Sequence, residues 1–282
     1  MNLPLENADR PTVEGFGREW STFTQSDSEF SAAERQTIFD GYFSIFPWQA
    51  LPPNAVGADI GCGSGRWATM VAPRVGTLHA VDASSDALAI ARTNLAGTDN
   101  VRFHQASVSA LPFADGELDF AYSLGVLHHV PDTAGAIRDV GAKLKPGAPF
   151  LIYLYYAFDN RSALFRAIWM ASNIVRIVLS RMPYALQIVA TTVIAATVYW
   201  PLARAAALLE RIGAMPRSWP LAFYRHRSFY VMRTDAFDRF CTRLEQRFTR
   251  VQIADMLGAA GFTDIKFSEN EPFWVAVAIK AR

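Results

Sequence analysis

The fold is indicated most clearly by Gly57-Ala58-Asp59-Ile60-Gly61-Cys62-Gly63-Ser64-Gly65-Arg66-Trp67-Ala68. A short apolar run ends in three alternating glycines, and a helical pattern follows. Glycines at the end of a strand let the backbone turn sharply and approach a ligand closely. The N-terminus of the following helix favours an anionic group. The stretch therefore predicts a strand, a tight turn and a helix, with a ligand site at the turn.

The spacing of the glycines separates two classes of ligand. The dinucleotide fingerprint is G-x-G-x-x-G, whereas this chain has G-x-G-x-G, with Arg66 where the third glycine would stand. Asp59 also lies two residues before the first glycine. An acid combined with backbone N–H groups suits the ammonium and carboxylate of a nucleoside that carries an amino acid. A pyrophosphate needs no such acid.

A second acid follows at the end of the next apolar run. Asp82 comes directly after Thr77–Val81, 21 positions beyond Gly61. An acid at this place can accept hydrogen bonds from ribose hydroxyls. The alternative is an ordinary acid at the N-terminus of the helix expected from Ser84. Because Asp82 follows the glycine turn, we favour the ribose role.

Further along, short apolar runs alternate with helical patterns over residues 41–157. The expected strands and helices of this region are Val56–Ile60, Thr77–Val81, Ser84–Leu95, Leu118–Leu124, Thr133–Leu144 and Phe150–Tyr155. This alternation predicts βαβ units and a parallel sheet. Residues 1–40 are expected to form an N-terminal cap. In this cap, Trp20 and Phe23 either cover a ligand or only pack against neighbouring side chains. Residues 223–282 return to the alternating pattern, with strands near 264–268 and 273–279.

The composition excludes several classes of protein. The chain has 282 residues, of which 51% are hydrophobic and 19% charged, so it is not disordered. A net charge of +1 gives no whole-chain argument for nucleic-acid binding. The two cysteines, Cys62 and Cys241, are too few for a disulfide framework and lack the spacing of a metal site. The first ten residues do not resemble a signal peptide, so a cytoplasmic protein is expected.

Further short motifs follow the glycine turn in a fixed order. They are Ser109–Phe113, Leu118–Phe120, Leu127-His128-His129-Val130-Pro131-Asp132, Leu144–Gly147 and Ala259–Phe262. Together with Asp59–Gly65 and Asp82, this set resembles class I S-adenosylmethionine-dependent methyltransferases of the ubiquinone/menaquinone-methyltransferase-like (methyltransferase type 11) group. The resemblance covers about residues 55–157 and 248–282. It implies an α/β fold: a Rossmann-like, seven-stranded, mostly parallel sheet with helices on both faces and an antiparallel last strand. Residues 158–222 would be an apolar helical insertion after the fifth strand.

The resemblance also implies S-adenosylmethionine as the cofactor, and it assigns roles to matching positions. Asp59, Gly61, Gly63 and Gly65 would hold the methionine part, and Cys62, between the first two glycines, is counted with them. Asp82 would bind the ribose, Ala83 would line the adenine, Val108 would offer a backbone N–H, and Ser123 would lie near the methionine. Family members often carry an acid where this chain has Ser107. A serine hydroxyl accepts more weakly from the adenine amino group, so this departure predicts reduced affinity.

Three residues are candidates for catalysis. A phenol or alcohol acceptor needs a general base, and histidine titrates near neutrality. His129 and His128 would follow the fourth strand at the cofactor edge, and Tyr155 would end the fifth strand. The alternative is that the two histidines only pack against or cap this loop and that Tyr155 only lines the site.

The insertion differs in charge from the remaining chain. From Arg161 to Arg217 it holds seven arginines and one acid, Glu210, a net charge of +6, so the rest of the chain carries −5. No charged residue lies between Arg181 and Arg204, a length that meets the requirement for a transmembrane helix. Polar residues dilute this stretch, prolines bracket it, and it interrupts a catalytic fold. We therefore favour other roles for it.

The favoured role is a buried lid helix over the acceptor, in which case truncation of Trp200 or Ile194 is expected to raise the acceptor's KM. The alternative is a helix on a membrane surface. There the arginines would meet anionic headgroups, and Trp169, Trp200 and Trp219 would lie at the interface. Either role points to a lipophilic acceptor.

The resulting prediction is a methyltransferase that moves a methyl group to an O or N atom of a small lipophilic metabolite, as in secondary metabolism. One alternative acceptor is a membrane lipid, a glycolipid or a quinone precursor, methylated on O or C. The other alternative is a non-catalytic S-adenosylmethionine-binding module. The identity of the acceptor and the oligomeric state stay open at this point.

Overall fold

The computed structural model describes residues 6–26, 30–216 and 219–282, which divide into two compact units. The first unit comprises Met1–Ser26, Arg35–Ala157 and Leu244–Arg282, and the second comprises Asp27–Glu34 and Phe158–Arg243. Residues 223–243, which we assigned from the sequence to the C-terminal part of the core, pack instead with the helical insertion. Arg217, one of the seven arginines counted above, lies outside the described residues.

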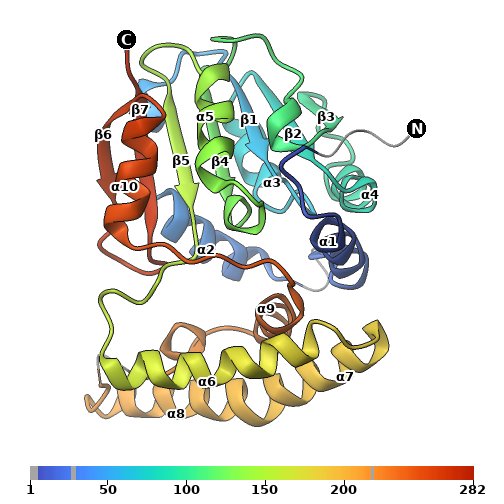
Figure 1. The fold of residues 1–282 in the computed structure, drawn as a ribbon, viewed down its shortest axis with the longest axis vertical. Coiled ribbons are helices and arrows are strands. Elements are labelled where there is room, and N and C mark those ends of the chain that lie inside the picture. Colours follow the sequence, from blue (N-terminus) through green and yellow to red (C-terminus); the bar gives the residue numbers. More distant parts are fainter. Residues whose placement is uncertain (1–5, 27–29, 217–218) are drawn as a thin grey trace. The chain divides into compact units, whose positions relative to one another are not determined.

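The first unit is built on a seven-stranded sheet of order β3-β2-β1-β4-β5-β7-β6 (Figure 1). The strands are β1 (Val56–Ile60), β2 (Thr77–Asp82), β3 (Val101–Gln105), β4 (Phe120–Leu124), β5 (Pro149–Tyr153), β6 (Phe262–Phe267) and β7 (Val275–Lys280). The first five run parallel, and β7 is antiparallel to both of its neighbours. The expected fold class is confirmed: a Rossmann-like, mostly parallel sheet with an antiparallel last strand.

The strand β3 has no counterpart among the strands expected from the sequence. Its five residues, Val-Arg-Phe-His-Gln, leave only Val101 buried, because β3 is the edge of the sheet. An edge strand needs little apolar sequence when its neighbour supplies the backbone partners, and here β2 pairs with it from Leu78 to Asp82. β5 also ends at Tyr153, so Tyr155 lies beyond the strand that we expected to contain it.

Helices cover both faces of this sheet. They are α1 (Arg10–Thr22), α2 (Ala32–Phe43), α3 (Ala68–Val71), α4 (Ser85–Asn94), α5 (Thr133–Lys143) and α10 (Arg250–Ala259). On one face, α5 and α10 contribute Ile137 and Ile253 to a single buried apolar cluster with Ile152. On the other face, the ring of Phe43 in α2 lies 5.4 Å from that of Tyr122 in β4. The sheet is thus buried on both sides, as the apolar runs of β1, β4 and β5 require.

The second unit is helical. It contains α6 (Ala163–Leu179), α7 (Tyr184–Ile194), a π-helical turn (Ala195–Tyr199), α8 (Trp200–Arg211) and α9 (Phe229–Cys241). Its small core joins Leu179 of α6, Ala195 and Tyr199 of the π turn, and Met232 and Ala236 of α9. Within the described residues, one helix, the continuous 28-residue run Tyr184–Arg211, is long and apolar enough to cross a membrane. The helical insertion after the fifth strand is therefore confirmed.

Candidate functional site

The glycine turn connects β1 to α3 at the carboxyl edge of the sheet. Gly61, Gly63 and Gly65 all have positive φ angles, of 78°, 54° and 74°. The N–H groups of Gly61 and Cys62 both donate to the carbonyl oxygen of Val81 in β2, at 2.8 and 2.9 Å. The turn is therefore tied to the neighbouring strand, and its backbone adopts a conformation that side chains other than glycine rarely allow.

Asp82 fastens the end of β2 to this turn. Its Oδ2 accepts the N–H of Gly63 at 2.9 Å, and its Oδ1 accepts the N–H of Ser84 at 2.8 Å. Ser84 in turn caps α4, because its hydroxyl accepts the N–H of Ala87. Burial raises the pKa of Asp82, and these backbone hydrogen bonds oppose the shift. A carboxylate has about four lone-pair positions, so these backbone hydrogen bonds leave room for a ribose hydroxyl.

Asp59 is the most perturbed acid of the site. It is 2% exposed, and its Oδ2 has no hydrogen-bond partner among the described residues. Burial raises the pKa of Asp59 to about 8, the Tyr122 hydroxyl opposes this shift, and the charge of Asp82 adds to it. A buried and a half-buried carboxyl group beside a glycine turn form a site that a cationic group would stabilise.

The remaining expected cofactor residues lie along the same edge. The N–H of Ala106 donates to the carbonyl of Asp82 at 3.0 Å, which brings Ser107 and Val108 next to the end of β2. Both are buried, and the hydroxyl of Ser107 pairs with that of Ser109 at 3.2 Å. The carbonyl of Ala83 accepts from the Gln105 amide at 3.3 Å. The structure thus places these residues beside Asp82.

Ser123 and Cys62 are both held in the interior at this edge. The hydroxyl of Ser123, fully buried, donates to the carbonyl of Ile60 at 2.8 Å and so ties β4 to β1. Burial raises the pKa of the Cys62 thiol well above its usual value, with the charges of Asp82 and Asp59 adding to the shift. The thiol is therefore protonated and unreactive near neutral pH.

The helix α1 lies against the glycine turn. A Cβ placed on Gly63 would lie 2.9 Å from the indole of Trp20, and one on Gly17 would lie 2.6 Å from the hydroxyl of Ser84. The guanidinium of Arg66 lies 5.8 Å from the ring centroid of Trp20 and 4.4 Å from that of Trp67. The expected N-terminal aromatic residue Trp20 is thus beside the predicted methionine site.

The three expected catalytic residues come together after β4 and β5. The His128 ring stacks on that of Tyr155 with a centroid distance of 3.9 Å, and the His129 ring lies 4.0 Å from His128 and 5.6 Å from Tyr155. The phenyl ring of Phe16 in α1 lies 5.0 Å from His129. Both histidines are buried. The sequence alone did not show that these side chains would touch.

The hydrogen bonds of the two histidines indicate different tautomers. Nδ1 of His129 lies 2.6 Å from the carbonyl oxygen of Leu244, which only accepts, so this nitrogen carries the proton and Nε2 is basic. Nδ1 of His128 accepts the N–H of Tyr155 at 3.4 Å, so its proton lies on Nε2. Burial lowers the pKa of His128 well below its usual value, with the charges of His129 and Arg247 adding to the shift. His129 is therefore the better-placed base, and His128 stays neutral.

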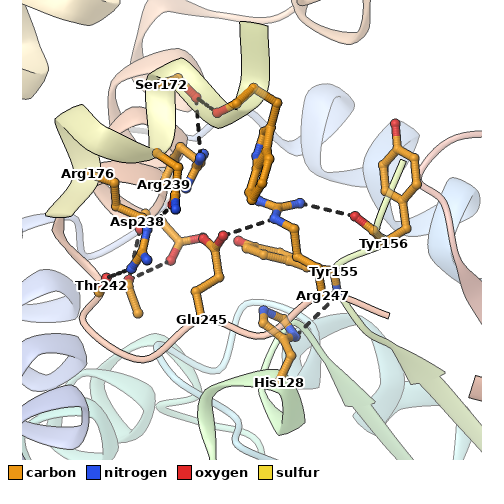
Figure 2. A network of polar contacts seen from close by, with 12 residues as sticks. His128, Tyr155, Tyr156, Ser172, Arg176, Asp238, Arg239, Thr242, Glu245 and Arg247 are labelled. Carbon is orange, nitrogen blue, oxygen red and sulfur yellow. Dashed lines mark hydrogen bonds and ion pairs between the residues drawn. The ribbon is translucent and has the colours of Figure 1, made fainter. Parts of the chain in front are cut away.

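A segment from the far end of the chain completes this cluster (Figure 2). The N–H of Gln246 donates to the carbonyl of His128 at 3.0 Å, and that of Phe248 donates to the carbonyl of Tyr155 at 2.9 Å. The guanidinium of Arg247 lies 5.0 Å from the ring centroid of Tyr155 and pairs with Glu245. No sequence signal marked residues 244–247, because they carry no motif.

Among the described residues, no three or more His, Cys, Asp or Glu side chains are grouped so that they could hold a metal ion. The site therefore consists of a buried carboxyl group, a half-buried one, a glycine turn and a histidine cluster on one edge of the sheet. The carboxyl ends of the strands are where open α/β sheets bind their ligands.

Comparison with known proteins gives three findings. Residues 58–147 match the family model described as a methyltransferase domain. The chain is 35% identical over 104 residues to an uncharacterized methyltransferase of Bacillus subtilis, covering 36% of this chain and 41% of that protein. It is 29% identical over 108 residues to the ubiquinone biosynthesis O-methyltransferase of Paracidovorax citrulli, covering 37% of this chain and 44% of that protein. The chain thus spans less than half the length of these relatives.

A solved structure is similar over nearly the whole chain. It is an S-adenosylmethionine-dependent methyltransferase of Thermotoga maritima, described as a possible histamine N-methyltransferase, with a TM-score of 0.52 at 14% identity. The match covers 96% of this chain and 100% of that one. At this identity the likeness concerns the fold.

Proposed function

Because the chain contains a methyltransferase domain over residues 58–147, we propose that it transfers a methyl group from S-adenosylmethionine to an O or N atom of a small lipophilic molecule. The observation that carries the proposal is Asp59, a buried acid whose Oδ2 has no hydrogen-bond partner among the described residues, beside a glycine turn. S-adenosylmethionine supplies a sulfonium-activated methyl group together with an ammonium, a ribose and an adenine, and each has a complementary group at this edge.

The cofactor would be held by residues that the fold has already positioned. Asp82 would accept from the ribose hydroxyls while it keeps Gly63 and Ser84 in place. Asp59 would pair with the ammonium, whereas the N–H groups of Gly61, Cys62, Gly63 and Gly65 already donate within the protein. Ser107 would contact the adenine amino group more weakly than an acid would, with Val108 and Ala83 beside it.

Transfer to a heteroatom needs mainly the alignment of donor and acceptor. His129 would remove the proton of a phenol or alcohol through Nε2, while the carbonyl of Leu244 holds its Nδ1–H. Tyr155 and the neutral His128 would pack against His129 and hold its ring in place. The proteins that resemble this domain include the ubiquinone biosynthesis O-methyltransferase named above and the phosphoethanolamine N-methyltransferase 2 of Caenorhabditis elegans, so both O and N are suitable attacked atoms in this proposal.

The insertion would help to bind the acceptor, because its apolar helices suit a lipophilic molecule. A membrane lipid, glycolipid or quinone precursor, methylated on O or C, is the second candidate class of acceptor. The proposed setting is cytoplasmic, with a small molecule and no nucleic acid as partner. A non-catalytic binding module would show no cofactor turnover against any of these acceptors.

Calorimetry with S-adenosylhomocysteine and NAD tests the cofactor assignment. The protein should bind S-adenosylhomocysteine and ignore NAD, and Asp82→Ala should weaken binding by about 1.5–3 kcal/mol, the range for hydrogen bonds to a charged group. Asp115→Ala, whose exposed acid lies before β4 and pairs with Lys143, is the control. Tight NAD binding without a response to S-adenosylhomocysteine would contradict the proposal.

A further inference from the structure

The second unit exposes an unusual number of large apolar side chains. Of the fifteen that are exposed in the described part of the chain, thirteen lie on α6, α7, the π turn and α8 or at the end of α8. They are Ile168, Met170, Ile174, Val175, Ile177, Val178, Leu186, Val189, Val193, Val198, Trp200, Leu208 and Ile212. Soluble proteins rarely expose a large contiguous apolar surface unless it binds something.

In α6 and α7, the exposed apolar side chains lie on other sides of the helix than the residues that contact α9. The inner side of α6 meets α9 through Ser172, whose hydroxyl accepts from Arg239, and through Trp169, whose ring lies 5.2 Å from the same guanidinium. In α7, Tyr184 packs on Phe237 of α9. On the outer sides, Ile174 is 66% exposed and Val189 is 61% exposed. Each of the two helices therefore exposes apolar side chains on the side that does not contact α9.

Exposed arginines stand at the ends of this apolar face. Arg166 lies in the first turn of α6, Arg181 just after α6, and Arg211 at the end of α8, and all three are exposed. Glu210, the one acid of the described residues 161–216, is already paired with Arg225 at 2.8 Å and His226 at 2.6 Å. Positive charge around an apolar face complements an anionic surface.

From this arrangement we infer that the outer face of α6, α7 and α8 lies on an anionic lipid bilayer, with the helices parallel to the membrane plane. The apolar side chains enter the boundary between headgroups and acyl chains, and the three arginines meet the phosphates. Trp200, which belongs to this face and is 48% exposed, is the interfacial aromatic residue. Of the tryptophans expected at the interface, Trp169 instead packs on Phe158, and Trp219 donates to the carbonyl of Leu202.

A membrane-spanning orientation does not suit the inner side of the same helices. Thr192 in α7 accepts from Arg233 of α9, and Arg204 in α8 donates to the carbonyls of Arg225 and Arg227. A span would carry α9, with Arg233, Asp235, Asp238 and Arg239, into hydrocarbon, where charged groups are expensive. The helices therefore lie in the interface.

A second copy of the chain suits this face less well than lipid. A symmetric dimer brings the same patch of both copies together. Here it would place the arginine-rimmed surface of one copy against that of the other, and like charges facing each other disfavour association. A small acceptor covers only part of a face in which α6 alone, with 17 residues, is about 25 Å long.

Co-sedimentation of the full chain with vesicles tests the inference without any acceptor. We expect binding to vesicles of phosphatidylcholine with one quarter phosphatidylglycerol, weaker binding to phosphatidylcholine alone, and a decrease as salt is raised. The double variant Ile174→Glu/Val189→Glu should bind at least tenfold more weakly. Val251→Glu is the matched control, because Val251 is 67% exposed on α10 of the first unit and should leave binding unchanged.

The arginines are tested separately, because their removal leaves the apolar face intact. Arg166→Gln/Arg181→Gln/Arg211→Gln should weaken binding to the anionic vesicles on the order of a hundredfold, about fivefold for each charge. Brominated lipids should quench tryptophan emission in the wild type and less in Trp200→Phe, which keeps the apolar bulk. Circular dichroism confirms that each variant is folded.

Four results would overturn the inference. The first is a wild-type protein that ignores anionic vesicles. The second is Ile174→Glu/Val189→Glu that binds them as the wild type does. The third is a change from dimer to monomer in that variant by light scattering, which would assign the face to a second copy. The fourth is resistance to alkaline carbonate extraction, which would indicate a span. If the wild type ignores vesicles and Ile174→Glu/Val189→Glu raises the KM for a water-soluble acceptor, the first result would assign the face to a lid.

Discussion

The carboxyl group of Asp59 links the protonation of the protein to its ligand. Its pKa of about 8 lies above the ordinary value of 3.8, so the folded ligand-free protein holds a proton that the unfolded chain has lost. The stability contribution of this group therefore falls as the pH rises from about 4 to about 8. A cationic ligand group beside Asp59 lowers the pKa again, and binding then releases a proton.

We expect the affinity for S-adenosylhomocysteine to rise with pH up to about 8, by at most about tenfold per pH unit. Asp59→Asn should remove this dependence and should stabilise the ligand-free protein at pH 8. Calorimetry in buffers of different ionisation enthalpy measures the released proton. Asp99→Asn, on an exposed turn, is the control. A pH-independent affinity in the wild type would mean that no cation meets Asp59.

His129 is the residue whose removal should affect the chemical step most. Nε2 is its basic nitrogen, because Nδ1–H is held by the carbonyl of Leu244. With a phenolic acceptor, His129→Gln should lower kcat by about 10²–10⁴ and leave the affinity for S-adenosylhomocysteine unchanged. Raising the pH above the pKa of the phenol should restore much of the rate. His226→Gln, which changes an exposed histidine of the second unit, should have no effect.

At the scale of elements, the glycine turn is held by close packing as well as by its backbone angles. A Cβ on Gly65 would lie 2.9 Å from Leu95 Cδ1 and 3.2 Å from Ala91 Cβ, both on the α4 side. Gly97 has a similar positive φ, 83°, but nothing lies within 4 Å of its Cβ position. A comparison of alanine substitutions at Gly65 and Gly97 therefore separates the effect of backbone strain from that of steric contact.

Gly97→Ala should destabilise the protein by about 1–2 kcal/mol, the cost of a left-handed alanine. Gly65→Ala should cost about 1–3 kcal/mol more, because α4 must move to admit the methyl group, and it should also weaken S-adenosylhomocysteine binding. Urea unfolding and calorimetry measure the two effects. Equal destabilisation by the two substitutions would show that the turn does not need close packing against α4.

At the scale of the whole molecule, the insertion leaves and rejoins the first unit at neighbouring points. Tyr156 and Phe248 form a parallel bridge, and the N–H of Ala157 donates to the carbonyl of Phe248 at 2.9 Å. Residues 158–243 therefore form an insertion whose two ends are adjacent. All seven strands of the sheet lie outside this insertion. A fold commonly tolerates the removal of an insertion whose ends are adjacent.

Replacement of residues 158–243 by a short glycine-serine linker should leave S-adenosylhomocysteine binding close to that of the full chain and abolish methylation of a lipophilic acceptor. The full chain with Val251→Glu serves as the active control. A truncated protein that is folded by circular dichroism but does not bind S-adenosylhomocysteine would show that the insertion contributes to the cofactor site.

The fold and the cofactor edge could be predicted because their signals are local. A strand, a glycine turn and an acid at fixed spacing determine their own geometry, and Asp59, Gly63 and Asp82 meet where parallel strands end. The edge strand β3 escaped prediction because its stability comes from pairing with β2 rather than from apolar residues of its own.

Contacts between residues far apart in the chain could not be predicted from the sequence. Leu244 orients His129 from 115 positions away, and Arg247 covers Tyr155, because the returning segment runs beside the ends of β4 and β5. The sequence determined that the insertion is apolar and basic. Packing on α9 decided which sides of α6 and α7 stay exposed, since a helix that is apolar almost all round can bury either side.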